Sequence, residues 1–291
     1  MLTRRRFLTA AAAAGLAPVA GRQTAAADDA EPGLTAYLSG EAIGRDAVLE
    51  WEARRLRVAA ERLRGNLPAA LAAELDALVL RPAQSTAEVA RDRERLVAVK
   101  MRMGEAEIRK LMAPDLAVSG PASEGAAAPG GWAVSSAGLA SSRGTAGGFA
   151  RWFTGERDRN DERAMLAACP DHYLVRTPRA GVQEVIEVTG GAVLAARFVI
   201  DYADTAGVPI ARDQGFPIDL SGWARGGDGV PIGAVRHQFR DDPRGGFAAR
   251  LAIAFPAVLP PWMISEHRWH LACEFSNWVL AYLAGRPATA Y

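Results

Sequence analysis

The chain has 291 residues, of which 49% are hydrophobic and 23% are charged, and this composition excludes a wholly disordered protein. The formal net charge of +1 argues against a nucleic-acid-binding protein that relies on bulk basic charge. No apolar run reaches the roughly 18 residues that a membrane span needs, and two cysteines are too few for a disulfide-dense scaffold or a four-cysteine zinc ribbon.

The first 27 residues have the pattern of an export signal. The run Arg4-Arg5-Arg6-Phe7-Leu8 precedes an Ala-rich apolar stretch over residues 9–20, and Ala25-Ala26-Ala27 offers a small-residue cleavage site. The alternative is an amphipathic helix, but residues 9–20 have no polar face. Paired arginines before Phe-Leu resemble the twin-arginine (Tat) export signal. We therefore expect residues 1–27 to be recognised by the Tat machinery and the mature chain, with a net charge of −3, to be periplasmic or secreted.

The next segment, residues 28–113, is predicted to be a helical region. Leucines recur every seven residues at Leu49, Leu56 and Leu63. Ser85 and Glu88 have the spacing of a capping box, so a further helix is expected to begin there. Two or three antiparallel helices would bury these apolar faces as a helical hairpin used for packing or for homodimerisation. No residue of this region belongs to a pattern that indicates catalytic or metal-binding chemistry.

Residues 114–148 are rich in Gly, Ala, Ser and Pro, a composition that predicts a flexible linker and a domain boundary. Beyond it, runs of β-branched and aromatic residues alternate with Gly-rich turns. Strands are expected over residues 183–188, 193–202, 218–225, 230–240 and 247–255, followed by one long amphipathic helix over residues 262–283. Strands joined by tight turns are antiparallel, and a single long helix can cover one face of their sheet. The predicted fold class is therefore α+β, with a helix-grip (START-like) domain over residues 149–291 in which the sheet wraps the C-terminal helix and leaves a pocket.

The predicted long helix carries the clearest chemical pattern. His270 and Glu274 are four residues apart, so they stack on one helix face and can offer two ligands to one metal. Glu266 and His267 share this broad face. The alternative is an ion pair on a solvated face, but the flanking side chains leave no plainly polar side, namely Trp269, Leu271, Phe275 and Trp278. On this helix we expect four apolar side chains to be largely buried, namely Trp262, Leu271, Phe275 and Trp278.

Other candidate residues lie on or near the predicted strands. Glu184 and Glu187 are three residues apart on one strand, so their side chains point to opposite faces and only one can face the pocket. His172 lies just before that strand. His237 lies inside a later strand, where a histidine satisfied within the core is the alternative to a functional one.

Three segments carry a family resemblance. The first runs from Trp152-Phe153 through Asp161 and Arg163 to Pro170 and His172. The second is Glu187-Val188-Thr189-Gly190-Gly191, and the third is His270-x-x-x-Glu274-Phe275-x-Asn277. Over roughly residues 149–285 they resemble the phloretin hydrolase and diacetylphloroglucinol hydrolase family, which are zinc-dependent carbon–carbon hydrolases on a helix-grip fold.

This resemblance implies a Zn²⁺ ion held by His172, Glu187, His270 and Glu274. Two neutral imidazoles and two carboxylates suit Zn²⁺ and leave the site formally neutral. The implied activity is hydrolysis of the carbon–carbon bond next to a ketone in an acylphenol-type compound, similar to phloretin or an acetylphloroglucinol. The leaving ring carbon must gain a proton, and His237 is the expected general acid.

Several alternatives stay open from the sequence. Tyr173 and Tyr202 are candidates for binding phenolic hydroxyls. Cys169 and Cys273 could form a disulfide, compete as zinc ligands, or be two unrelated buried thiols. In place of a hydrolase, the chain could be a non-catalytic helix-grip carrier of a hydrophobic aromatic ligand, or an interaction protein that works through its helical half.

Overall fold

A computed structural model of the chain describes residues 33–80 and 85–285, all within one compact unit, Glu31–Tyr291. The predicted signal peptide, residues 1–27, lies outside the described residues. Among the helices that the structure describes, none is both long enough and apolar enough to span a bilayer.

The elements follow one another in this order: β1 (Leu34–Leu38), β2 (Glu41–Ile43), α1 (Arg45–Arg64), α2 (Ala69–Leu80), α3 (Thr86–Ala127), β3 (Trp132–Ser141), α4 (Ala146–Asp158), α5 (Glu162–Leu166), β4 (His172–Arg179), β5 (Val182–Glu187), the 3₁₀ turn η2 (Thr189–Gly191), β6 (Ala196–Asp201), β7 (Ile218–Arg225), β8 (Pro231–Asp241), β9 (Phe247–Pro256) and α6 (Pro261–Leu283).

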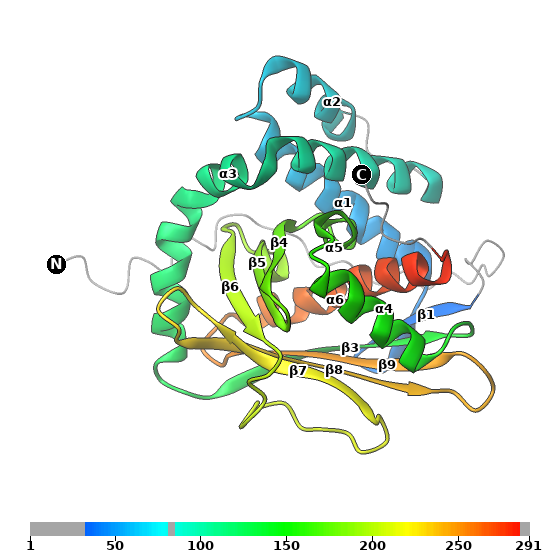
Figure 1. Cartoon of the computed structure of the whole chain (residues 1–291). Helices are drawn as coiled ribbons and strands as arrows, with labels where there is room; N and C mark the ends of the chain where they lie inside the picture. Colours follow the sequence, from blue (N-terminus) through cyan, green and yellow to red (C-terminus); the bar gives the residue numbers. More distant parts are fainter. Residues whose placement is uncertain (1–32, 81–84, 286–291) are drawn as a thin grey trace. The chain divides into compact units, whose positions relative to one another are not determined.

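The strands form one antiparallel sheet in the order β2-β1-β3-β9-β8-β7-β6-β5-β4. The hairpins β5–β6, β7–β8 and β8–β9 match the predicted strand runs to within a few residues. The long helix α6 matches its prediction as well and packs on β3 (Figure 1). The fold is therefore α+β, with a large antiparallel sheet and a long C-terminal helix.

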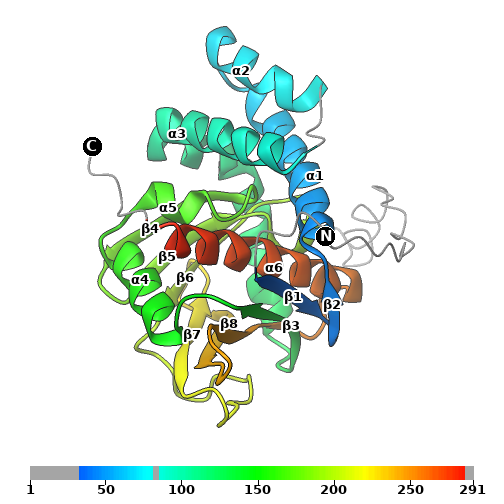
Figure 2. The ribbon, with the colours of Figure 1, turned by 90° about the vertical axis from the view of Figure 1, so that its right-hand side faces the viewer.

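The helix α6 lies between the sheet and a layer of helices. Figures 1 and 2 show β3 and β1 on one side of α6 and α1 and α3 on the other, with α2 farther from the sheet. Residues of α6 contact β3, η2 and α1. A helix covered on both sides has no wholly polar face, which explains the mixed apolar pattern of residues 262–283.

The prediction of a flexible linker over residues 114–148 is wrong. Helix α3 continues through Pro114 and Pro121 to Ala127, and β3 pairs with β1 on one side and with β9 on the other. Tertiary contacts stabilise this part of α3, because Ser119 Oγ donates to the carbonyl of Ala195 at 2.7 Å. Small residues of β3 such as Ser135 and Ala137 are buried, and a Cβ added at Gly138 would lie 3.3 Å from Cβ of Tyr37 on β1.

The predicted division between a helical region and an independent domain over residues 149–291 is also wrong. The region predicted to be helical contributes β1 and β2 to the sheet, in addition to α1, α2 and most of α3. One apolar core joins Trp51 and Leu139 to Phe149 and Phe275. The C-terminal segment therefore shares its sheet and its core with the residues before it.

Three of the four side chains expected to be buried on the long helix are buried. Leu271 is 0% exposed, Phe275 1% and Trp278 6%, whereas Trp262 is 50% exposed. Trp262 lies in the first turn of α6, before the first buried residue of that helix, Ile264. The expectation for Trp262 was wrong because this turn extends beyond the packed part of the helix.

Candidate metal centre

The four side chains implied as metal ligands converge at one point beside α6. His172 begins β4, Glu187 ends β5, and His270 and Glu274 lie one turn apart on α6. The Nε2 atoms of the two histidines are 3.2 Å apart. Oε2 of Glu187 lies 3.6 and 3.7 Å from these nitrogens, and Oε2 of Glu274 lies 3.3 and 3.8 Å from them. All four residues are buried, so the fold gathers two imidazoles and two carboxylates away from water.

Neighbouring groups orient two of these side chains. Nδ1 of His172 is 3.2 Å from the carbonyl oxygen of Met165, so this nitrogen donates and Nε2 is left to face the cluster. The hydroxyl of Thr189 donates to Oε1 of Glu187 at 2.9 Å and leaves Oε2 facing the histidines. Outer contacts of this kind fix the tautomer and the direction of metal-binding side chains in proteins.

The helical region supports the segment that carries His172. On α1, Arg55 makes a two-pronged ion pair with the fully buried Asp171, with Nε–Oδ2 and Nη2–Oδ1 distances of 2.8 Å. On α3, Nζ of Lys100 donates to the carbonyl oxygens of Pro170 and His172. The helical region therefore positions the segment that carries His172, a role that the sequence pattern did not indicate because these contacts join residues 70 or more positions apart.

The side chains of the two glutamates of β5 point to opposite faces of the sheet, as their spacing predicts. Glu184 faces away from the cluster and pairs with Arg109 at 2.7 Å and with Arg197 at 2.6 Å. Glu187 faces α6. The turn after it approaches α6 so closely that a Cβ at Gly190, which has a φ of +56°, would lie 2.4 Å from the carbonyl oxygen of Met263. Glycine at this position therefore lets the end of β5 meet the helix.

His267 also lies beside this cluster, although the sequence analysis assigned it no role. It is 1% exposed, and its ring stacks on that of His270 with a centroid distance of 4.7 Å. One of its ring nitrogens lies within 4.8 Å of ligand atoms of both Glu187 and His270. The sequence pattern could have indicated this position, because His267, His270 and Glu274 follow the three- and four-residue spacing of one helix face.

Burial dominates the electrostatics of the cluster. It raises the pKa of Glu187 to about 7, an effect that the charge of His172 opposes and that of Glu274 reinforces. Burial also raises the pKa of Glu274. Burial alone would lower the pKa of His172, but its hydrogen bond to Glu274 and the two carboxylate charges raise it overall. The pKa of His270 is held well below its usual value by burial and by the neighbouring histidines. In the absence of a metal the cluster therefore keeps protons that a metal ion would displace.

The other predicted site residues divide between the cavity and the core. His237, on β8, borders the same cavity, and burial lowers its pKa to about 3. The hydroxyl of Tyr202 also borders it and donates to Oε1 of Gln183 at 3.3 Å. Tyr173 does not border this cavity. It lies in a second apolar cluster with the ammonium of Lys100 4.8 Å from its ring centre, so its predicted role in binding a phenolic hydroxyl is wrong.

Both cysteines are buried and are free thiols in the structure. Sγ of Cys273 lies 3.7 Å from the carbonyl oxygen of Ala168 and 3.6 Å from Nδ2 of Asn277. Sγ of Cys169 lies within 4.8 Å of ligand atoms of His172 and His270. Burial raises the pKa of both thiols, which disfavours the thiolate that a metal requires. Imidazole and carboxylate groups are therefore the stronger candidate ligands.

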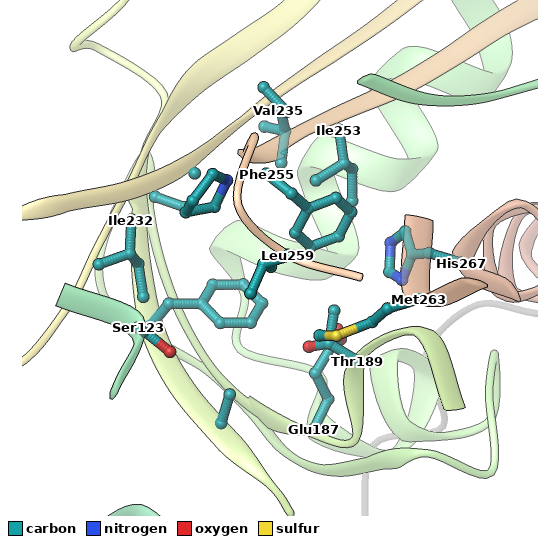
Figure 3. Close-up of a pocket in the computed structure, with 16 residues that line it drawn as sticks. Ser123, Glu187, Thr189, Ile232, Val235, Ile253, Phe255, Leu259, Met263 and His267 are labelled. Atoms are coloured by element: carbon teal, nitrogen blue, oxygen red, sulfur yellow. The ribbon is translucent and has the colours of Figure 1, made fainter. Parts of the chain in front are cut away.

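Two pockets meet at this cluster. The inner pocket contains the four converging residues together with Gln183, Tyr202 and His237. The outer pocket has an empty volume of about 590 Å³, including its open part, and is mostly apolar. Figure 3 shows the outer pocket with Met263 and His267 of α6 on one side, Ile232, Val235 and Ile253 of the sheet on another, and Glu187 and Thr189 at its edge. The pockets share five lining residues, namely Glu187, Phe198, Val235, Ile253 and His267.

No family model matches the sequence, and no curated protein matches it. Among solved structures, the crystal structure of Ara h 8.0201 aligns with 14% sequence identity and a TM-score of 0.35, over 53% of this chain and 99% of that chain. The site itself is a buried group of two histidines and two glutamates at the meeting point of two pockets.

Proposed function

We propose that this protein is a zinc-dependent hydrolase on a helix-grip fold, which cleaves the carbon–carbon bond next to a ketone in an acylphenol-type compound. The observation that carries the proposal is the convergence of His172, Glu187, His270 and Glu274. These residues come from three separate segments, and they are the set that the resemblance to phloretin and diacetylphloroglucinol hydrolases implies. The antiparallel sheet beside α6 is consistent with the helix-grip arrangement of that family.

The spacing of the four side chains suits zinc. Four ligand atoms at about 2.1 Å from an ion, in a tetrahedron, lie roughly 3.4 Å from one another. The five distances given above run from 3.2 to 3.8 Å. Zinc bound there would act as a Lewis acid towards the ketone oxygen.

The protein's own residues would position the substrate and move protons. Hydrolysis adds the hydroxyl of water to the acyl carbon and a proton to the ring carbon that leaves. Tyr202 and Gln183 offer hydrogen bonds to phenolic hydroxyls in the inner pocket. His237 remains our candidate for delivering the proton. Burial lowers its pKa to about 3, so it is neutral near pH 7, and an anionic ring next to it would raise that pKa and favour protonation.

The second candidate function is that of a carrier for a hydrophobic aromatic ligand. The apolar lining of the outer pocket favours it, because such a surface binds ligands without any chemistry. In that case the metal, or the buried polar cluster itself, would fix the orientation of the ligand.

Metal analysis and an activity assay on the purified protein test the proposal together. We expect about one zinc per chain and release of a phenol and a carboxylic acid from an acylphloroglucinol. His270→Ala should lose the metal and the activity. The matched variant His237→Gln should keep the metal and lose about 10²- to 10⁴-fold in turnover. Zinc retained in His270→Ala would refute the site, whereas a zinc protein that binds acylphenols without cleaving them would be a carrier.

A further inference from the structure

The two pockets differ sharply in chemistry. The inner pocket carries polar groups on several sides, including Gln183, Tyr202 and His237 in addition to the metal cluster. The outer pocket has 16 lining residues, of which four have polar side chains. Two of these four, Glu187 and His267, lie where the pockets meet. A ligand that spans both pockets is therefore polar at its inner end and hydrocarbon at its outer end.

The walls of the outer pocket offer little to a second polar ring. They consist mainly of aliphatic and aromatic side chains, namely Phe198, Ile232, Val235, Ile253, Phe255, Leu259 and Met263. Hydroxyl groups bound against these walls would lose their hydrogen bonds to water without replacement.

His267 marks the point where an oxygen atom of the ligand would sit. Both of its ring nitrogens are buried and lack a hydrogen-bond partner within the described residues. A neutral imidazole always carries one N–H donor, and a buried donor without a partner is unfavourable. A T-shaped contact with Phe255 and a stacked contact with His270 hold the ring in place, at centroid distances of 4.9 and 4.7 Å. An oxygen entering the junction would satisfy this donor.

We propose that the outer pocket binds the acyl chain of the substrate, and that His267 donates a hydrogen bond to the ketone oxygen at the junction. This inference rests on the proposed function and narrows it. The phenol ring occupies the inner pocket beside Tyr202 and His237. The acyl group is a hydrocarbon chain of several carbons rather than an acetyl group, because an acetyl group would leave the outer pocket unfilled.

A chain-length series tests the proposal. The probes are 2,4,6-trihydroxyphenyl ketones with unbranched acyl chains of about two to eight carbons, titrated into the zinc-loaded protein by calorimetry. Each added methylene group should tighten binding roughly two- to fourfold until the outer pocket is filled. Ile232→Trp narrows this pocket and should abolish the chain-length dependence without changing zinc content. Leu259→Trp is a second narrowing variant, should the first not fold. Val134→Trp, at a 39% exposed position of β3, is the matched control and should leave the series unchanged.

A separate variant tests the role of His267 through its ketone affinity and its zinc content. His267→Leu should weaken every ketone in the series by a similar factor, about tenfold, and leave the zinc content intact. Loss of zinc in this variant would instead make His267 a metal ligand and overturn its assignment to the ketone oxygen.

The outcomes separate this inference from the proposed function. Cleavage of the ketones with no dependence of affinity on chain length would overturn the acyl-chain pocket and leave the hydrolase standing. Chain-length-dependent binding without cleavage would support the pocket and refute the hydrolase. Failure of every ketone to bind would overturn both.

Discussion

Arg55 and Asp171 form a buried, two-pronged ion pair that ties helix α1 to the residue next to His172. Asp171 is 0% exposed and Arg55 is 7% exposed. The pair spans 116 residues of sequence, so the position of a candidate metal ligand depends on a helix far away in the chain.

The first prediction concerns this pair. Arg55→Met leaves the Asp171 carboxylate buried without its partner and should lower the free energy of unfolding by about 3–5 kcal/mol. Denaturant titration measures the loss. On the same helix, Arg57 forms an exposed ion pair with Glu61, and Arg57→Met should cost about 1 kcal/mol or less. The double variant Arg55→Met/Asp171→Asn should be more stable than Arg55→Met alone. Equal stability of the Arg55 and Arg57 variants would contradict the supporting role of the buried pair.

The second prediction concerns the close approach of η2 and α6. Gly190→Ala places a Cβ 2.4 Å from the carbonyl oxygen of Met263 at a residue with positive φ. We expect a loss of about 2–5 kcal/mol from the left-handed conformation and the overlap together. Gly207 has a φ of +68° and open space around its added Cβ, so Gly207→Ala isolates the conformational cost at about 1–2 kcal/mol. Thermal unfolding measures the loss of stability in each variant. Equal losses would show that the backbone at Met263 moves away from the added Cβ at little energetic cost.

The third prediction is that metal affinity falls as the pH is lowered. Burial raises the pKa of Glu187 to about 7, so this carboxyl holds a proton below about pH 7. Burial lowers the pKa of His172, but the carboxylates of Glu274 and Glu187 raise it overall, so His172 keeps its proton more readily than a free imidazole. A metal ion must displace these protons, and the apparent Kd for zinc should rise about tenfold or more for each pH unit below 7. Competition with a chromophoric chelator, corrected for the protonation of the chelator, measures this dependence. A flat profile between about pH 8 and 6 would mean that the cluster binds metal without losing protons.

The fourth prediction concerns the limits of the folding unit. A fragment of residues 149–291 should not fold alone, because it lacks β3, which pairs with β9 from Trp132 to Ser141. It also lacks Trp51 and Leu139 of the shared core. A chain that begins at Glu31 should unfold cooperatively. Circular dichroism during thermal unfolding distinguishes the two, and a cooperative transition of the shorter fragment would show that the C-terminal part is an independent domain.

The fifth prediction concerns export. Replacing Arg4 and Arg5 together by lysine should stop transport through the Tat machinery, because that signal requires the paired arginines. The precursor should then accumulate inside the cell, and the mature form, expected to begin at Asp28, should be missing from the exported fraction. Immunoblotting of cell fractions shows either result, and unchanged export of the variant would refute a twin-arginine signal.

The sequence by itself determined the elements that depend on local patterns. The hairpins β5–β6, β7–β8 and β8–β9 follow from alternating strands and glycine-containing turns, which act over a few residues. The pairing of His270 with Glu274 follows from the helical repeat. The choice between Glu184 and Glu187 followed from the resemblance, and the structure places Glu187 beside the histidines.

Only the tertiary structure decided the role of segments whose composition is ambiguous. Small residues over 132–141 suit a flexible linker as well as a strand, and pairing with β1 and β9 makes them a strand. Pro114 and Pro121 disfavour a helix locally, yet contacts such as that of Ser119 with Ala195 hold α3 together there. The contacts by which Arg55 and Lys100 support the segment of His172 likewise join residues that are 70 or more positions apart. A local sequence pattern does not indicate which distant side chains pack together in the folded protein.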